Sequence, residues 1–160
     1  MTTTLAGTPG ISRFTTAQLL RTARLFASDP ELGSLLDTGA GHRQRRLLDA
    51  SDHLQIWLLA WPPGSDTGWH DHDGVAGAFH VVDGLLAEHT WDGGRVHERL
   101  LGPDEGRGYG TAHLHHVANV GDEPALSLHL VTPALSRMTR YALRGGAMTP
   151  VGVERAGVDW

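Results

Sequence analysis

From Leu54 onward the sequence is divided into short apolar or alternating runs, and this division constrains the fold more than any other feature. Each run is bounded by glycine, proline or aspartate, which are typical of turns. The runs cover residues 54–60, 77–82, 85–91, 95–101, 115–120, 126–131 and 137–143. The turn signals fall at residues 62–68, 83–84, 92–94, 102–108 and 121–124. Short strands at this spacing are typical of an antiparallel sandwich or small barrel, so we expect an all-β fold.

A helical segment is expected before these strands. Residues 15–28 place leucine, alanine and phenylalanine side chains at helical spacing behind Thr15 and Thr16, either of which can cap the helix. A second short helix is expected over residues 32–36, because Pro30 suits a first helical turn.

The length indicates one domain. A chain of 160 residues can bury a core of its own but is too short for two ordinary domains. We find no internal repeat, low-complexity tract or linker. We therefore predict a single domain over residues 1–160, with the helical segment at about 15–37 and the barrel at about 43–150.

The charge balance argues against two classes of partner. The chain has 13 basic and 18 acidic residues, whereas binding to nucleic acid or to an anionic membrane requires a clustered cationic face. No apolar run approaches the roughly 18–20 residues of a membrane span. The opening residues MTTTLAGTPGIS lack a basic segment followed by an apolar one. We therefore expect a cytoplasmic protein that binds neither nucleic acid nor membrane.

Histidine is the residue type that most suggests chemistry. The chain has eleven histidines and no cysteine, so any metal must be held by His, Asp or Glu. On an extended segment His70 and His72 point to the same side and can face one metal. In the segment HLHHV, His113 and His115 share one face and His116 takes the other. By spacing alone, any of these three could complete the site.

The glycines around the first histidine pair resemble a known motif. Five residues separate Gly64 from His70, four separate His72 from Gly77, and six separate Gly77 from Gly84. This pattern resembles the first motif of the cupin superfamily, except that Gly77 stands where the motif usually carries a glutamate ligand.

A second match lies further along the chain. His115, followed after three residues by Asn119, resembles the end of the second cupin motif and selects His115 over its neighbours. The resemblance covers roughly residues 43–143. It implies a double-stranded β-helix, which is a jelly-roll barrel, behind the short N-terminal helices.

The absence of the glutamate ligand reduces the number of cupin families that this sequence resembles. Residues 115–120 and 123–130 are similar to the corresponding segment of the thiol dioxygenases of the cysteine dioxygenase type. The residues that by position would bind Fe(II) in this family are His70, His72 and His115. The Ser-His pair that the family places beside the metal would be Ser127 and His129. We treat the other histidines as non-ligands: His42, His53, His80, His89, His97, His113 and His116.

Two family residues are replaced in this sequence. The tyrosine that follows the second-sphere histidine by two residues falls on Val131, and the cysteine that crosslinks to that tyrosine falls on Gly77. Without the phenol, we expect a difference in the reaction rate, in the coupling of oxygen use to product formation, or in the substrate itself. Tyr109 or Tyr141 could supply a hydroxyl from elsewhere in the chain.

The three-histidine face fits the family chemistry. Three neutral imidazoles leave the opposite positions of Fe(II) open for a bidentate substrate and dioxygen. They also leave the metal dicationic, which favours an anionic thiolate. The product of the family reaction is a sulfinic acid.

A carboxylate on the substrate requires a cation in the pocket wall. In residues 42–49 (HRQRRLLD), Arg45 best matches the carboxylate-binding arginine of the cysteine-specific members. The members that act on mercaptopropionate have a glutamine in this region and a later arginine, a pattern that points to Gln44 and Arg140. Both patterns can be traced in this sequence.

Three functions remain open at this point. The first is an Fe(II)- and oxygen-dependent dioxygenase that acts on a small carboxylated thiol such as cysteine or 3-mercaptopropionate. The second is a non-heme iron cupin oxygenase that acts on a different sulfur or nitrogen compound in specialised metabolism. The third is a non-enzymatic cupin in which the same histidines hold Zn or Ni. The sequence does not indicate an oligomeric state.

Overall fold

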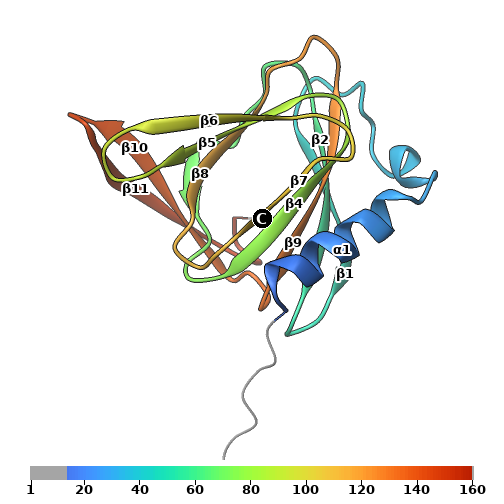
Figure 1. Cartoon of the computed structure of the whole chain (residues 1–160), viewed down its shortest axis with the longest axis horizontal. Helices are drawn as coiled ribbons and strands as arrows, with labels where there is room; N and C mark the ends of the chain where they lie inside the picture. Colours follow the sequence, from blue (N-terminus) through green and yellow to red (C-terminus); the bar gives the residue numbers. More distant parts are fainter. Residues whose placement is uncertain (1–13, 160) are drawn as a thin grey trace, which may run out of the picture.

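The computed structural model describes residues 14–159, which form two facing β-sheets with a helix packed outside one of them (Figure 1). The helical elements are α1 (Thr16–Ala27) and the 3₁₀ helix η1 (Leu32–Leu35). The strands are β1 (Gln44–Ala50), β2 (Gln55–Trp61), β3 (Trp69–Asp71), β4 (Ala76–Asp83), β5 (Leu86–Trp91), β6 (Val96–Leu101), β7 (Gly106–Tyr109), β8 (Leu114–Asn119), β9 (Ala125–Thr132), β10 (Arg137–Arg144) and β11 (Ala147–Arg155).

All neighbouring strands pair antiparallel. The five-stranded sheet has the order β1-β2-β9-β4-β7, and the six-stranded sheet has the order β11-β10-β3-β8-β5-β6. Successive strands therefore alternate between the two sheets over much of the chain, as in a jelly roll. The expected double-stranded β-helix behind an N-terminal helical segment is confirmed.

Helix α1 covers the outer face of the five-stranded sheet. The side chain of Thr15 accepts a hydrogen bond from Gln18 N, and the Gln18 side chain accepts one from Thr15 N, so a capping box begins the helix. Leu19 and Ala23 are fully buried against alternate residues of the sheet. The predicted helix is confirmed with Thr15 as its N-cap. The expected second helix is only the four-residue 3₁₀ turn η1.

Alternation along β2 and β9 decides which side chains reach the interior of the barrel. Ile56 and Leu58 of β2 and Leu128 and Leu130 of β9 lie in the cluster beneath α1. The residues between them point inward, where Trp61 and its neighbours fill one end of the barrel. Toward the other end the interior carries the histidines and a cavity.

Four strands were not predicted: β1, β3, β7 and β11. Residues 102–108 were expected to be a turn, yet Gly106 and Gly108 belong to β7. A Cβ at Gly106 would lie 2.9 Å from Leu20 Cδ2, and one at Gly108 would lie 2.8 Å from Thr16 Cβ. The glycines therefore let β7 approach α1, and their presence hides the strand pattern. At the C-terminal end, β11 continues to Arg155, past the expected limit of the barrel at about residue 150.

Within residues 14–159, no helix is both long and apolar enough to cross a membrane.

Candidate metal centre

Three histidines converge inside the barrel from the six-stranded sheet. His70 of β3 and His115 of β8 are direct cross-strand partners, and His72 follows the end of β3. One ring nitrogen from each lies within 4.8 Å of those of the other two. All three side chains are buried. The structure thus brings together the three residues that the sequence predicted as ligands.

Hydrogen bonds orient two of these rings. His70 Nδ1 lies 3.1 Å from the carbonyl oxygen of Gly68, and His115 Nδ1 lies 2.9 Å from Glu88 Oε1. Nδ1 therefore carries the proton in both rings, and Nε2 is the nitrogen left for a metal. His72 Nδ1 is buried and has no hydrogen-bond partner within residues 14–159. A cluster of inward-facing imidazoles with an unpartnered nitrogen fits a metal ion well.

Burial keeps the triad neutral. Desolvation lowers the pKa of His70 to about 4 and lowers the pKa of His72 and His115 well below the usual histidine value. Repulsion between the rings adds to the effect on His72 and His115. Neutral imidazole is the form that binds a metal, so the site needs no proton release from these rings near neutral pH.

Glu88, which lies behind the triad on β5, was not predicted from the sequence. Its side chain is fully buried, its Oε1 accepts from His113 Nε2 at 2.7 Å as well as from His115, and its Oε2 lies 2.7 Å from Arg107 Nε in an ion pair. His113 is thus directed toward Glu88. The position of Glu88 two residues after Leu86 in an alternating run could have indicated that Glu88 points into the barrel, because Leu86 is buried.

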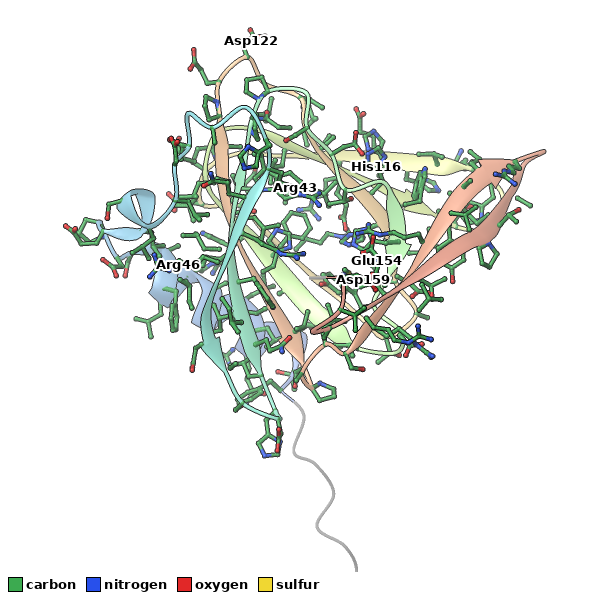
Figure 2. All side chains as sticks on the ribbon, turned by 180° about the vertical axis from the view of Figure 1, so that it is seen from behind. Arg43, Arg46, His116, Asp122, Glu154 and Asp159 are labelled. Atoms are coloured by element: carbon green, nitrogen blue, oxygen red, sulfur yellow. The ribbon has the colours of Figure 1, made fainter. Side chains whose placement is uncertain are left out.

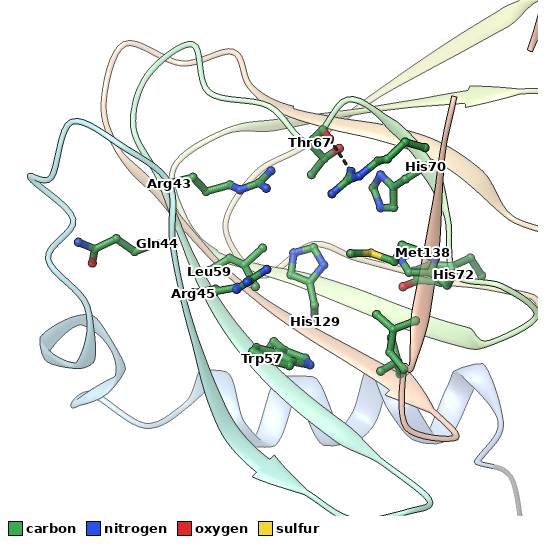
Figure 3. Close-up of a pocket in the computed structure, with 14 residues that line it drawn as sticks. Arg43, Gln44, Arg45, Trp57, Leu59, Thr67, His70, His72, His129 and Met138 are labelled. Carbon is green, nitrogen blue, oxygen red and sulfur yellow. Dashed lines mark hydrogen bonds between the residues drawn. The ribbon is translucent and has the colours of Figure 1, made fainter. Parts of the chain in front are cut away.

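A cavity of about 330 Å³ adjoins the triad (Figure 3). Its lining residues are Arg43, Gln44, Arg45, Trp57, Leu59, Thr67, His70, His72, Tyr109, His129, Val131, Leu135, Met138 and Arg140. No aspartate or glutamate is among them. The size is at the lower end of the range for small-molecule sites.

The predicted Ser-His pair is formed on the opposite wall. Ser127 and His129 point inward from β9, with Ser127 Oγ 2.9 Å from His129 Nε2. Trp61 Nε1 donates to the same Ser127 Oγ at 2.8 Å, so the serine hydroxyl can donate to His129 Nε2. The His129 proton then lies on Nδ1. Burial lowers the pKa of His129 to about 3, which keeps the ring neutral.

Three arginines face the cavity, including both that the sequence proposed. Arg43 immediately precedes β1, Arg45 lies on β1, and Arg140 lies on β10 as the cross-strand partner of His70. Gln44 borders the cavity, but its side chain points away (Figure 3), and its Oε1 accepts from Asp37 N at 3.0 Å. The alternation of β1 explains this difference, because Arg43 and Arg45 share the face opposite to that of Gln44.

Tyr109 enters the cavity wall beside Gly77. Its ring stacks on His72 with a centroid distance of 5.0 Å, and its buried hydroxyl has no hydrogen-bond partner within residues 14–159. A Cβ at Gly77 would lie 2.4 Å from that hydroxyl oxygen, so the phenol occupies the space that a side chain at position 77 would take. Burial, together with the charge of Glu88, raises the pKa of Tyr109 and keeps it protonated.

Tyr141 lies outside the cavity. Its hydroxyl donates to Asp71 Oδ2 at 2.6 Å, a bond that helps to raise its pKa to about 12. Val131 lines the cavity and pairs with Gly77, whose other strand partner is Tyr109. Of the two tyrosines considered from the sequence, Tyr109 is therefore the one placed at the site.

Solved structures of low sequence identity share the fold. An uncharacterized conserved protein with a double-stranded beta-helix domain from Klebsiella pneumoniae subsp. pneumoniae MGH 78578 matches with a TM-score of 0.58 at 14% identity, over 78% of this chain and 97% of its own. A cupin superfamily protein from Desulfitobacterium hafniense DCB-2 has a TM-score of 0.56 at 18% identity, over 67% and 93% of the two chains. An oxalate oxidase in complex with the substrate analogue glycolate has a TM-score of 0.57 at 16% identity, over 71% and 62%.

The sequence itself matches a family model. No curated protein matches the chain. Residues 27–144 match the model of the family described as Cysteine dioxygenase type I. Together with the buried histidine triad, this match supports a cupin-type metal-dependent oxygenase. Since the match covers well over half of the residues, the chain belongs to the cysteine dioxygenase type I family.

Proposed function

We propose that the protein is an Fe(II)-dependent thiol dioxygenase that converts a small carboxylated thiol, such as cysteine or 3-mercaptopropionate, to its sulfinic acid. The observation that carries the proposal is a buried face of three neutral histidines without a carboxylate ligand, opening onto a cavity with three arginines. Membership of the cysteine dioxygenase type I family supports the same reaction.

The reaction balances with the thiol and dioxygen alone. The O–O bond breaks, two S–O bonds form, sulfur loses four electrons and dioxygen gains them, so that a thiolate becomes a sulfinate. A ferrous ion bound by His70, His72 and His115 would supply an open coordination face for the thiolate and the redox chemistry for dioxygen. Because the three ligands are neutral, they leave the dicationic charge of the metal to favour the thiolate.

The arginines orient the other end of the substrate. A guanidinium presents its N–H groups in a planar fork that matches a carboxylate. Arg45 of β1 and Arg43 just before it project into the cavity from the side of the five-stranded sheet, opposite His70 and His72 (Figure 3). A thiol held between the two sides would have its sulfur at the triad and its carboxylate at the arginines.

Two further groups act on the bound reactants. His129 is fixed by Ser127 and Trp61, so its Nδ1–H is the group that can donate to an oxygen in the cavity. Tyr109 offers a hydroxyl that has no acceptor within residues 14–159, and this hydroxyl lies over Gly77 beside the triad. We assign Tyr109 the donor role that the family tyrosine would have from the position of Val131.

Oxygen uptake by the reconstituted protein tests the proposal. The protein is loaded with Fe(II) under anaerobic conditions and then mixed with oxygen and cysteine, 3-mercaptopropionate or cysteamine in turn. We expect uptake of one dioxygen per thiol and a product heavier by two oxygen atoms, with little reaction of cysteamine, which has no carboxylate. Stoichiometric iron without oxygen uptake for any thiol would contradict the proposal. His115→Ala serves as the inactive control.

A further inference from the structure

We infer that the preferred substrate carries two anionic groups in addition to its thiol, and that it is most simply a thiol dicarboxylate. This inference rests on the proposed function for the role of the thiol, but the anion site itself rests on the arginines. Three arginine side chains line one cavity of about 330 Å³ in which no acidic side chain takes part.

Only one of the three arginines is neutralised by a carboxylate. Arg140 Nη2 lies 2.7 Å from Glu154 Oε2, and its Nη1 donates to the carbonyl oxygen of Thr67 at 2.7 Å. Within residues 14–159, neither Arg43 nor Arg45 forms an ion pair. Arg43 Nη1 donates to the carbonyl oxygen of Asp66 at 2.8 Å. The cavity therefore keeps an excess of two positive charges before any metal is counted.

The positive charges of the arginines repel one another in the cavity. Burial lowers the pKa of Arg43, and the nearby charges of Arg140 and Arg45 lower it further, whereas the carboxylates of Asp66 and Glu154 oppose this shift with smaller effects. Bringing like charges together in a partly desolvated site is unfavourable unless an anion compensates them. An anionic ligand would relieve this repulsion and recover the charge-assisted hydrogen bonds that the guanidinium groups lack.

The two free arginines are positioned to hold separate groups. The Arg43 guanidinium lies 5.3 Å from the ring centroid of Trp61, whereas that of Arg45 lies 6.0 Å from the centroid of Trp57. These tryptophans are four residues apart on β2, a strand that rises about 3.3 Å per residue. The two guanidinium groups therefore lie over different rings, so each is available to a different anionic group.

The same charge disfavours an amino group on the substrate. Cysteine carries an ammonium, and an ammonium placed among three arginines would be repelled and would find no acid in the cavity wall. The expected order of affinity is therefore a thiol dicarboxylate first, 3-mercaptopropionate second and cysteine third.

Equilibrium binding to the Fe(II)-loaded protein without oxygen tests this order, because no turnover occurs. The matched probes are mercaptosuccinate and 3-mercaptopropionate, which differ by one carboxylate, and the measurement is titration calorimetry. We expect mercaptosuccinate to bind about tenfold more tightly or better, as one additional charge-assisted interaction provides. Equal affinities, or tighter binding of 3-mercaptopropionate, would overturn the inference.

Single substitutions test whether Arg43 and Arg45 cause the preference for a second carboxylate. In Arg43→Gln and in Arg45→Gln we expect the preference for mercaptosuccinate to fall to about threefold or less, since each variant loses one anion partner. The matched control is Arg46→Gln, because Arg46 lies on the outer face of β1 (Figure 2) and donates to the carbonyl oxygen of Leu35. The preference should persist in this control. A preference that survives in both cavity variants would overturn the inference.

A second pair of probes separates the inference from the proposed function. Succinate and propionate lack the thiol, so their relative affinity for the metal-free protein reports on the anion site without any contribution from binding to iron. Tighter binding of succinate would support the inference even if no sulfinate formed when oxygen was admitted, and that result would contradict only the proposed function. Formation of sulfinate from thiols with no preference for a second carboxylate would contradict only the inference.

Discussion

The two sheets present very different side chains to the same cavity. The six-stranded sheet contributes the histidine triad, whose rings are buried and are oriented by Gly68 and Glu88. The five-stranded sheet contributes Arg43 and Arg45 at the cavity mouth, where Arg45 is largely exposed to solvent. In the proposed function, metal binding is thus preorganised on one wall, while Arg43 and Arg45 on the other wall select the substrate anion. The difference implies that the two tasks can be disrupted separately.

Removal of a triad histidine should have the largest effect. His115→Ala is expected to abolish stoichiometric iron binding and to reduce oxygen consumption below detection, since two imidazoles cannot hold the metal tightly. Iron content by elemental analysis and oxygen uptake check this result. His116→Ala is the matched control, because the next residue on β8 points to the opposite face. Stoichiometric iron in His115→Ala would show that the triad is not the metal site.

Tyr109→Phe should lower kcat by about 100-fold while iron content stays unchanged. This magnitude is typical of the loss of one preorganised donor. Because the hydroxyl has no hydrogen-bond partner in the described part of the chain, its removal should leave the melting temperature of the metal-free protein unchanged or slightly raised. Steady-state kinetics and thermal unfolding check the two expectations. Tyr141→Phe, which alters the tyrosine outside the cavity, should retain wild-type kcat.

Glu88→Gln tests whether the histidine wall depends on its buried carboxylate. We expect the affinity for Fe(II) to fall about 10–100-fold, the usual effect of losing a carboxylate that orients a ligating histidine. Anaerobic metal titration measures this change. Glu98→Gln is a suitable control, because Glu98 forms a hydrogen bond with His89 at the surface, away from the triad. An unchanged affinity in Glu88→Gln would mean that the triad is oriented by the barrel alone.

The stability of the metal-free protein, as distinct from its activity, should depend on pH. The folded state depresses the pKa of His70 to about 4 and of His129 to about 3, whereas unfolded histidine titrates near 6.5. Between these values the unfolded state binds more protons, so the free energy of unfolding falls as the pH is lowered below about 6.5. Each such histidine contributes at most about 1.4 kcal/mol per pH unit.

Denaturant unfolding at several pH values measures this slope. His129→Gln should reduce the slope by about one proton, because this ring no longer titrates on unfolding. A slope in this variant equal to that of the wild type would indicate that His129 is not held neutral in the folded protein.

Much of the fold followed from local patterns in the sequence. The alternating runs predicted seven strands, and the helical spacing of apolar residues in 15–28 predicted α1, because both patterns reflect burial of one face. Strand β7 was missed because its glycines serve the contact with α1 rather than the strand itself. Strand β1 was missed because its side chains are mostly exposed or charged, which weakens the apolar signal.

Some residues of the site could also be predicted from local sequence patterns, whereas others could not. His70, His72 and His115 could be predicted because they lie in motifs with fixed spacing. Glu88 could not, since its contact with His115 spans 27 positions and depends on the pairing of β5 with β8. The sequence indicated arginines near Arg45, but the joint placement of Arg43, Arg45 and Arg140 required the two sheets to be brought face to face.

X-ray absorption at the iron edge tests the central claim most directly. The claim is that three histidines hold the metal and leave positions open to the substrate sulfur. In the anaerobic Fe(II)-loaded protein we predict scattering from three imidazoles, and a sulfur ligand should appear when 3-mercaptopropionate or mercaptosuccinate is added. Scattering from fewer imidazoles, or an iron environment that gains no sulfur when thiol binding is saturated, would contradict the account.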